Sequence, residues 1–182
     1  MSQSFPIGAI MMLETGNPAV RFKPRLVEGV ELAVDREPER FILDGQQRLT
    51  SLYQSVFRNK PVATRDQRKR TIRRWYYIDM AKSLEPNTER EEAIRSLPEE
   101  RQIKNFRKEL VEDYSTPELE FAAGLFPLSM VFDCAEWRTG FNAFWKYAPE
   151  KSRLLDQFEK YVVKRFESYQ IPVIKLLRET PK

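Results

Sequence analysis

Short apolar runs in the first part of the chain predict strands. Ile7 to Glu14 is nearly continuous in apolar character and is followed by the turn sequence Thr15-Gly16-Asn17-Pro18, which is typical of a buried strand that ends in a turn. Residues 40–43 form a second short run. A segment rich in proline, glycine and charge lies between them and contains a further candidate strand, Val27 to Val34.

The period of the pattern changes directly after Asp44-Gly45. From there to Asn59 the apolar residues recur at spacings of three and four, which predicts an amphipathic helix. The residues on its apolar face are Leu49, Leu52, Tyr53, Val56 and Phe57.

The middle of the chain alternates between charged and aromatic segments. Trp75 to Asp79 has the aromatic and β-branched content of a strand. Residues 81–120 are highly charged and poor in apolar residues, which favours an exposed insertion that is helical in pieces. Leu125 to Phe132 again predicts a buried strand, with Pro127 favouring an edge position or a strand start.

The last third of the chain predicts two helices and a final strand over residues 169–177. The first helix carries an aromatic face, which we interpret as core because its spacing is helical. Its members are Trp137, Phe141, Phe144 and Trp145. The stripe of the second helix comprises Leu154, Leu155, Phe158, Tyr161, Val162 and Phe166.

This order of elements predicts a mixed α+β domain in which helices surround a small mixed sheet. We expect residues 1–182 to form a single domain. The chain opens almost inside a strand and finishes shortly after another. We therefore expect it to be truncated at both ends, as a fragment of a longer polypeptide.

Composition narrows the location and the chemistry. Charged residues make up 32% of the sequence, and no apolar run approaches the roughly 18 residues of a membrane span. The start of the chain lacks the basic and apolar regions of a secretory signal, so we expect a cytoplasmic protein without a membrane partner.

The sequence contains no histidine and a single cysteine, Cys134. These counts exclude an internal disulfide, a multi-cysteine zinc site and every histidine-dependent catalytic or metal site. An enzyme of this composition depends on carboxylates, Arg, Lys, Gln and backbone amides. The net charge of +4 permits an anionic partner without requiring one.

The candidate site is the loop Asp44-Gly45-Gln46-Gln47-Arg48, where a strand opens directly into a helix. Unpaired N–H groups and the positive end of the helix dipole meet there, so an anion can bind. Gly45 would let the backbone approach a phosphate, Arg48 would contact it, and Gln46 and Gln47 would add donors. Asp44 would cap the helix or hold Mg²⁺.

Hydrolysis at this loop needs a side chain that positions water, and Asp44, Gln46 and Gln47 are the catalytic candidates. The glycine patterns of the common phosphate-binding loops are absent from the sequence. A different interpretation stays open. The motif would then only cap a helix in a catalytically silent DNA-recognition or protein-docking module.

A basic stretch precedes the aromatic strand at Trp75. Positive charge next to aromatic residues is common in nucleic-acid grooves, so we predict DNA contact here. The simpler alternative is a solvated loop ahead of a strand. The candidate residues are Arg65, Arg68, Lys69, Arg70, Arg73 and Arg74.

The string Phe41-Ile-Leu-Asp-Gly-Gln-Gln-Arg-Leu-Thr-Ser-Leu52 resembles the signature of the GmrSD modification-dependent restriction enzymes, in their N-terminal domain. Phe5 to Ile10 resembles the family's early Pro-Ile-Gly strand, and Tyr169 to Val173 resembles a later one. The Arg-Tyr-Trp and Phe-x-x-x-Asn-x-x-Gly segments that usually flank these strands are missing, which adds to the expectation of a fragment.

The resemblance implies a ParB/sulfiredoxin-like fold whose DGQQR loop binds and hydrolyses a nucleoside triphosphate with Mg²⁺. That role falls on Asp44, Gly45, Gln46, Gln47 and Arg48. It also implies that hydrolysis is coupled to recognition of modified DNA in phage defence. Cleavage would belong to a separate histidine-bearing nuclease domain, in cis or in trans, so we expect no nuclease activity from this chain.

Overall fold

The computed structural model describes residues 8–16, 23–34, 36–87 and 89–177. Two compact units make up the chain. One holds Met1–Gln54 together with Tyr169–Lys182, and the other holds Ser55–Ser168. The elements of both units confirm the predicted mixed α and β class.

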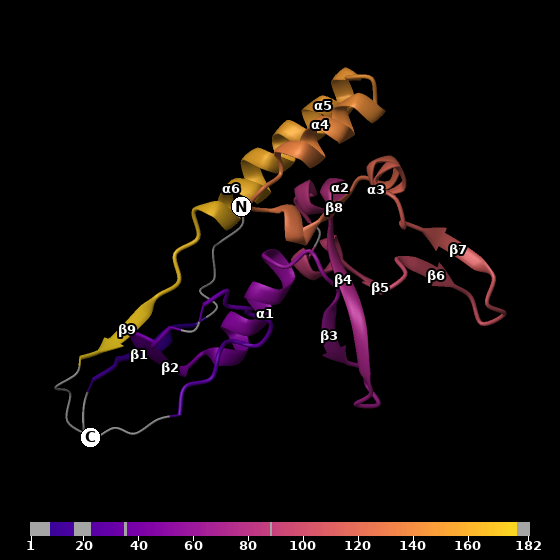
Figure 1. Ribbon diagram of the computed structural model, residues 1–182. Helices are drawn as coiled ribbons and strands as arrows, with labels where there is room; N and C mark the ends of the chain where they lie inside the picture. Colours follow the sequence, from indigo (N-terminus) through magenta and orange to yellow (C-terminus); the bar gives the residue numbers. More distant parts are fainter. Residues whose placement is uncertain (1–7, 17–22, 35, 88, 178–182) are drawn as a thin grey trace. The chain divides into compact units, whose positions relative to one another are not determined.

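The first unit is built on a mixed sheet with the strand order β2-β1-β9 (Figure 1). Its strands are β1 (Ile10–Glu14), β2 (Arg40–Asp44) and β9 (Val173–Leu176). β1 runs antiparallel to β2 and parallel to β9, so segments from both ends of the chain meet on one central strand. These strands confirm the predictions, although Ile7, the predicted start of the first, lies outside the described residues.

The helix that follows β2 is α1 (Gln46–Val56), which begins where the period change predicted it. Gln54 is buried near the end of this helix, and its Nε2 donates to the carbonyl of Glu28 at 3.0 Å. The strand predicted at Val27 to Val34 was wrong. That segment contains a turn in which Val30 N donates to the Val27 carbonyl, and it has no strand partner among the described residues.

The second unit has a sheet centred on the long strand β4 (Thr71–Asp79). β4 pairs antiparallel with β3 (Val62–Arg65), β5 (Ile94–Pro98) and β8 (Leu125–Pro127). A separate hairpin, β6 (Gln102–Lys104) with β7 (Leu110–Asp113), leaves the end of β5. The strand predicted from Leu125 onward is shorter than expected because a 3₁₀ turn, η2 (Leu128–Met130), follows Pro127.

Residues 81–120 contain helical pieces, as predicted, but also the three short strands β5, β6 and β7, which were not predicted. The segment is not wholly exposed either, since Ala93 and Leu97 are buried. Leu97 packs with Tyr77 and Leu125 and is the one deeply buried residue of β5, so this short strand gives no clear alternation of apolar and polar residues in the sequence. The helical pieces in this region are α2 (Met80–Leu84), η1 (Arg90–Ala93) and α3 (Pro117–Ala123).

Aromatic packing holds α3, β8 and α4 (Ala135–Phe144) together. The Trp137 ring lies 5.2 Å from Phe121, 4.9 Å from Phe126 and 5.2 Å from Phe141, measured between ring centroids. Trp137 and Phe141 are buried, which confirms the core interpretation of the predicted aromatic face. Phe144 ends the helix with 40% of its surface exposed.

The last helical stretch contains a change of period that the sequence pattern did not predict. It consists of α5 (Pro149–Phe158), the π-helical turn η3 (Glu159–Val163) and α6 (Lys164–Glu167). A π turn adds one residue per turn, so the buried position after Phe158 is Val163. Tyr161, predicted to lie on the stripe, is 46% exposed.

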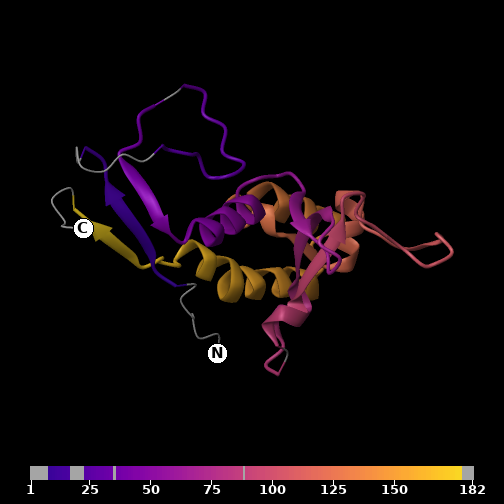
Figure 2. The same ribbon diagram turned by 90° about the horizontal axis from the view of Figure 1, so that it is seen from below.

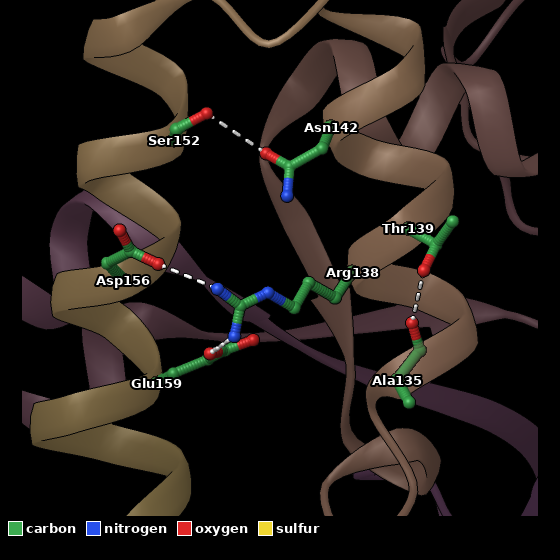
Figure 3. Close-up of polar contacts among 7 residues, drawn as sticks. All are labelled: Ala135, Arg138, Thr139, Asn142, Ser152, Asp156 and Glu159. Carbon is green, nitrogen blue, oxygen red and sulfur yellow. Dashed lines mark hydrogen bonds and ion pairs between the residues drawn. The ribbon is translucent and has the colours of Figure 1, made fainter.

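Polar contacts join α4 to this stretch (Figure 3). The Arg138 guanidinium donates to Asp156 Oδ1 at 3.0 Å and to Glu159 Oε2 at 2.6 Å. Ser152 Oγ donates to Asn142 Oδ1 one turn farther along. Polar contacts therefore join α4 to the last helical stretch, while the aromatic residues Trp137 of α4 and Phe158 of α5 each pack on Phe126 of β8.

Candidate functional site

The loop between β2 and α1 depends on a glycine. Gly45 is buried and has a φ of +88°, in the left-handed region that favours glycine. A Cβ at this position would lie 3.2 Å from Ile10 Cγ1 and 3.4 Å from Ile10 Cα. Gly45 therefore allows the start of α1 to pack directly against β1, in addition to any approach to a ligand.

Gly45 is the residue that directly precedes α1. The Gly45 carbonyl accepts the first helical hydrogen bond, from Leu49 N at 2.9 Å, so Gly45 is the N-cap residue. The alternative that Asp44 caps the helix was therefore wrong by one position, because the strand continues through Asp44. The N–H groups of Gln46 and Gln47 precede that first bond and have no intrahelical acceptor.

The side chains of Asp44 and Arg48 meet across the first turn. Arg48 Nη2 donates to Asp44 Oδ2 at 2.9 Å. The Arg48 side chain is 38% exposed and the Asp44 side chain is 70% exposed. The Arg48 guanidinium also lies against Gly8, where a Cβ would overlap Nη1. The arginine is thus positioned by two groups and still faces solvent in part.

The two glutamines of the loop have different surroundings. Gln46 Nε2 donates back to the carbonyl of Ile42 in β2 at 2.8 Å. The Gln47 side chain is exposed and makes no hydrogen bond to the described part of the chain. Gln47 is therefore the glutamine whose side chain is available to solvent or to a ligand.

These residues line a depression of about 370 Å³. Its walls are formed by Leu43 and by all the predicted loop residues, Asp44 to Arg48. The volume lies at the lower end of the range of small-molecule sites. Among the described residues no three metal-binding side chains come together, so Asp44 is the carboxylate that this loop offers to a cation.

The basic stretch runs from the end of β3 through the turn of the β3–β4 hairpin into the first residues of β4. Asp66 fixes the turn, because its Oδ1 accepts from the N–H groups of Arg68 and Arg70, each at 2.9 Å. Hydrogen bonding, chiefly from the Arg70 N–H, lowers the pKa of the Asp66 carboxyl.

The six predicted DNA contacts do not form one surface. Arg70 pairs with Asp66 at 2.7 Å, and Arg73 pairs with Glu99 at 2.8 Å. Arg65 and Arg73 lie on one face of the hairpin and Arg74 lies on the other, as the register requires. Within the described ranges, Arg65, Arg68, Lys69 and Arg74 form no ion pair, and the first three lie near the tip.

Sequence reasoning missed the contact of Gly8 with Arg48. In the sequence Gly8 is only part of a strand signature, and its φ of +93° is the reason for a glycine there. In the described part of the chain, none of the helices has both the length and the apolar character needed to span a bilayer.

A family model described as "GmrSD restriction endonuclease, N-terminal domain" matches residues 1–181. Comparison with curated proteins and with solved structures gave no match. The family match covers the candidate loop, the β3–β4 hairpin and β9. The expected similarity to the ParB/sulfiredoxin fold stays a prediction.

Proposed function

The chain belongs to the GmrSD restriction endonuclease N-terminal domain family, and on this premise we propose that its loop Asp44 to Arg48 binds a nucleoside triphosphate with Mg²⁺. The observation that carries the proposal is the depression at the N-terminus of α1, lined by all five of these residues. The domain then serves as the nucleotide-handling part of a restriction system and requires a nuclease domain, in cis or in trans, for cleavage.

The phosphate groups are assigned to the helix N-terminus. The N–H groups of Gln46 and Gln47 and the positive end of the helix dipole favour an anion at this point. Arg48 adds a guanidinium that is already held within reach by Asp44 and Gly8. A charge-assisted contact from arginine to phosphate is about twice as strong as a neutral hydrogen bond.

The donor set fits Mg²⁺, which is commonly held by one or two carboxylates together with phosphates and water. Asp44 would hold the ion, since its side chain is 70% exposed. A bound Mg²⁺ would neutralise part of the negative charge of the phosphates. Asp44 pairs with Arg48 in the absence of a ligand, and a bound Mg²⁺ would compete with the guanidinium for the Asp44 carboxylate.

Positioning of water for hydrolysis is assigned to Asp44, Gln46 and Gln47. Gln47 is the strongest of these candidates because its side chain is exposed. Gln46 instead uses its amide nitrogen in the bond to Ile42, which leaves its Oε1 as an acceptor. Gln47→Ala should then slow phosphate release more than it weakens nucleotide binding.

The experiment that tests the proposal is thermal unfolding with each of the four nucleoside triphosphates, with and without Mg²⁺. A ligand present at 100 times its dissociation constant stabilises the folded state by about 2.7 kcal/mol. We expect one or more nucleotides to raise Tm, and Arg48→Ala to remove the increase. Arg25→Ala is the matched control, since Arg25 is an exposed arginine of the same unit outside the loop.

The variant Asp44→Asn distinguishes Mg²⁺ binding from nucleotide binding. It should remove the Mg²⁺-dependent part of the increase in Tm and leave any Mg²⁺-independent part. If no nucleotide raises Tm of the wild type, or if Arg48→Ala keeps the full increase, the loop is not the site. The motif would then serve a catalytically silent recognition or docking module.

A second function, DNA contact, is favoured by the β3–β4 hairpin. Arg65, Arg68 and Lys69 lie near its tip without an ion pair in the described part of the chain. Replacing all three by Ser should weaken DNA binding and reduce the salt slope by about one for each phosphate that the protein no longer neutralises. Unchanged affinity and slope would reject this surface.

A further inference from the structure

The β6–β7 hairpin presents a bare aromatic ring to solvent. Phe106 lies at its tip and is 90% exposed. Figures 1 and 2 both show this hairpin extending away from the helices of its own unit. A phenylalanine that contributes nothing to the core, at the end of a projecting ribbon, is placed for contact with another molecule.

The turn that carries Phe106 is held by hydrogen bonds. Asn105 Oδ1 accepts from Arg107 N at 2.9 Å and from Glu109 N at 3.0 Å. Lys108 N donates to the Asn105 carbonyl at 2.9 Å, with a Lys108 φ of +64°. The ring is therefore presented by an organised backbone, which lowers the entropy cost of binding.

The charge around the ring is positive. Lys104, Arg107 and Lys108 are exposed and form no ion pair with any described residue. Of the three acidic side chains of the same hairpin, Glu112 is neutralised by an ion pair, whereas Glu109 and Asp113 accept hydrogen bonds from neutral amides and keep their charge, so residues 104–109 carry three cations and one carboxylate. Glu109 accepts from Asn105 at 2.7 Å, Glu112 pairs with Arg95 at 2.6 Å, and Asp113 accepts from Gln102 at 3.1 Å.

We propose that the β6–β7 hairpin binds duplex DNA, with Phe106 inserted at a base step and Lys104, Arg107 and Lys108 on the flanking phosphates. β-ribbons contact DNA in the major or the minor groove, and insertion of an apolar side chain at a base step is made from the minor groove. Phenylalanine is one of the apolar side chains that proteins insert between bases. The Arg107 guanidinium lies over the Phe106 ring, 5.2 Å from its centroid, so charge and stacking surface reach the same point.

The β6–β7 hairpin shares its ligand with the proposed DNA surface of the β3–β4 hairpin, but it binds through different residues. The test uses a series of short DNA duplexes, each with one 2-aminopurine at a different position. Fluorescence anisotropy measures binding of the chain, and fluorescence intensity reports unstacking of the 2-aminopurine base. Because insertion unstacks the reporter base, its fluorescence should rise at one or more steps when the wild-type chain binds.

Phe106→Ala should remove that rise and weaken binding about 5-fold to 100-fold, the range of aromatic–base stacking. Phe106→Tyr should retain both signals. Tyr147→Ala is the matched control, since Tyr147 is another exposed aromatic of the same unit, 66% exposed. Because Phe106 is almost fully exposed, its replacement should leave Tm unchanged.

The two DNA surfaces can be told apart by their variants. If Phe106→Ala binds like the wild type, or if no reporter position brightens, insertion is rejected whether or not the β3–β4 variant binds more weakly. If Phe106→Ala is weakened and the β3–β4 variant is not, insertion holds and the β3–β4 surface is rejected. A wild-type chain that does not bind duplex DNA overturns both.

Discussion

The Arg48 guanidinium lies directly over Gly8, in the space that a side chain at position 8 would occupy. Asp44 holds the same guanidinium from the other side at 2.9 Å. Gly8 comes just before β1, Asp44 ends β2, and Arg48 is in the first turn of α1. The position of the arginine is therefore determined by three segments of one unit, and each can be tested separately.

Gly8→Ala should move Arg48 out of its place. The new methyl group would overlap Nη1, and the φ of +93° adds strain of about 1–2 kcal/mol. We expect nucleotide affinity to fall about tenfold, the equivalent of about 1.4 kcal/mol. Titration with the nucleotide that gives the largest increase in Tm measures the change in affinity.

Gly29→Ala is the control for the strain. Gly29 has a similar φ of +92° but lies in the turn between Val27 and Val30. It should reduce stability by about as much as Gly8→Ala and leave nucleotide affinity unchanged. Equal decreases of affinity in both variants would show that the packing of Arg48 on Gly8 does not matter.

Gly45→Ala should destabilise the fold more strongly than an ordinary glycine replacement. Both its φ of +88° and the approach of Ile10 to 3.2 Å oppose a Cβ, so we expect a decrease of about 2–4 kcal/mol in the free energy of unfolding. Gly124→Ala, with a φ of +67° and its nearest neighbour Met80 Cε at 3.8 Å, should cost only about 1 kcal/mol. Urea denaturation compares the two, and equal decreases would contradict the packing argument.

The arrangement of the candidate site could be predicted from sequence because its parts are local. A strand, a glycine and a helix follow one another within residues 40–56, and each has its own periodic or turn signal. These signals predict the motif residues at one helix start, and the structure brings them together there. The contact with Gly8 could not be predicted, since it joins residues separated in the chain and depends on a positive φ.

The strands in the middle of the chain could not be predicted for a related reason. In β5 the charged and polar residues Arg95 and Ser96 stand beside the buried Leu97, and a short strand with one deeply buried residue gives no clear alternation. The prediction of the apolar face failed after Phe158 because the π turn changes the helical period. A prediction from periodicity assumes a constant period and cannot detect an inserted residue.

A buried carboxyl in the second unit predicts a dependence of stability on pH. Glu120 is 4% exposed and accepts from Tyr77 Oη at 2.7 Å and from Arg101 Nη1 at 3.0 Å. Burial raises the pKa of Glu120 above its usual 4.5, and the contacts with Tyr77 and Arg101 offset only part of that effect. Burial and the contact with Glu120 also raise the pKa of Tyr77.

A raised pKa means that the folded state binds the proton more tightly than the unfolded state does. The stabilisation from Glu120 is then complete below pH 4.5 and is lost as the pH rises through the pKa of the folded state. Glu120→Gln cannot titrate, so its free energy of unfolding should increase relative to wild type as the pH rises from about 4 upward. Denaturation across that range checks the sign. A relative decrease would mean that the pair with Arg101 outweighs burial.

The contacts of Arg138 allow two ion pairs on one guanidinium to be compared (Figure 3). The Glu159 side chain is 15% exposed, whereas that of Asp156 is 62% exposed. Burial raises the pKa of Glu159 in spite of the nearby Arg138 charge. Removing the arginine therefore leaves Glu159 as a poorly solvated carboxylate, while Asp156 remains in water.

Arg138→Met should reduce the free energy of unfolding by about 1–3 kcal/mol, and most of that decrease should come from Glu159. A double-mutant cycle with Glu159→Gln should give a coupling energy of about 1 kcal/mol or more, and a cycle with Asp156→Asn less than about 0.5 kcal/mol. Urea denaturation of the wild type and of the single and double variants measures both coupling energies. Equal coupling in the two cycles would mean that burial does not decide the strength of these pairs, because the two carboxylates share one guanidinium and differ chiefly in exposure.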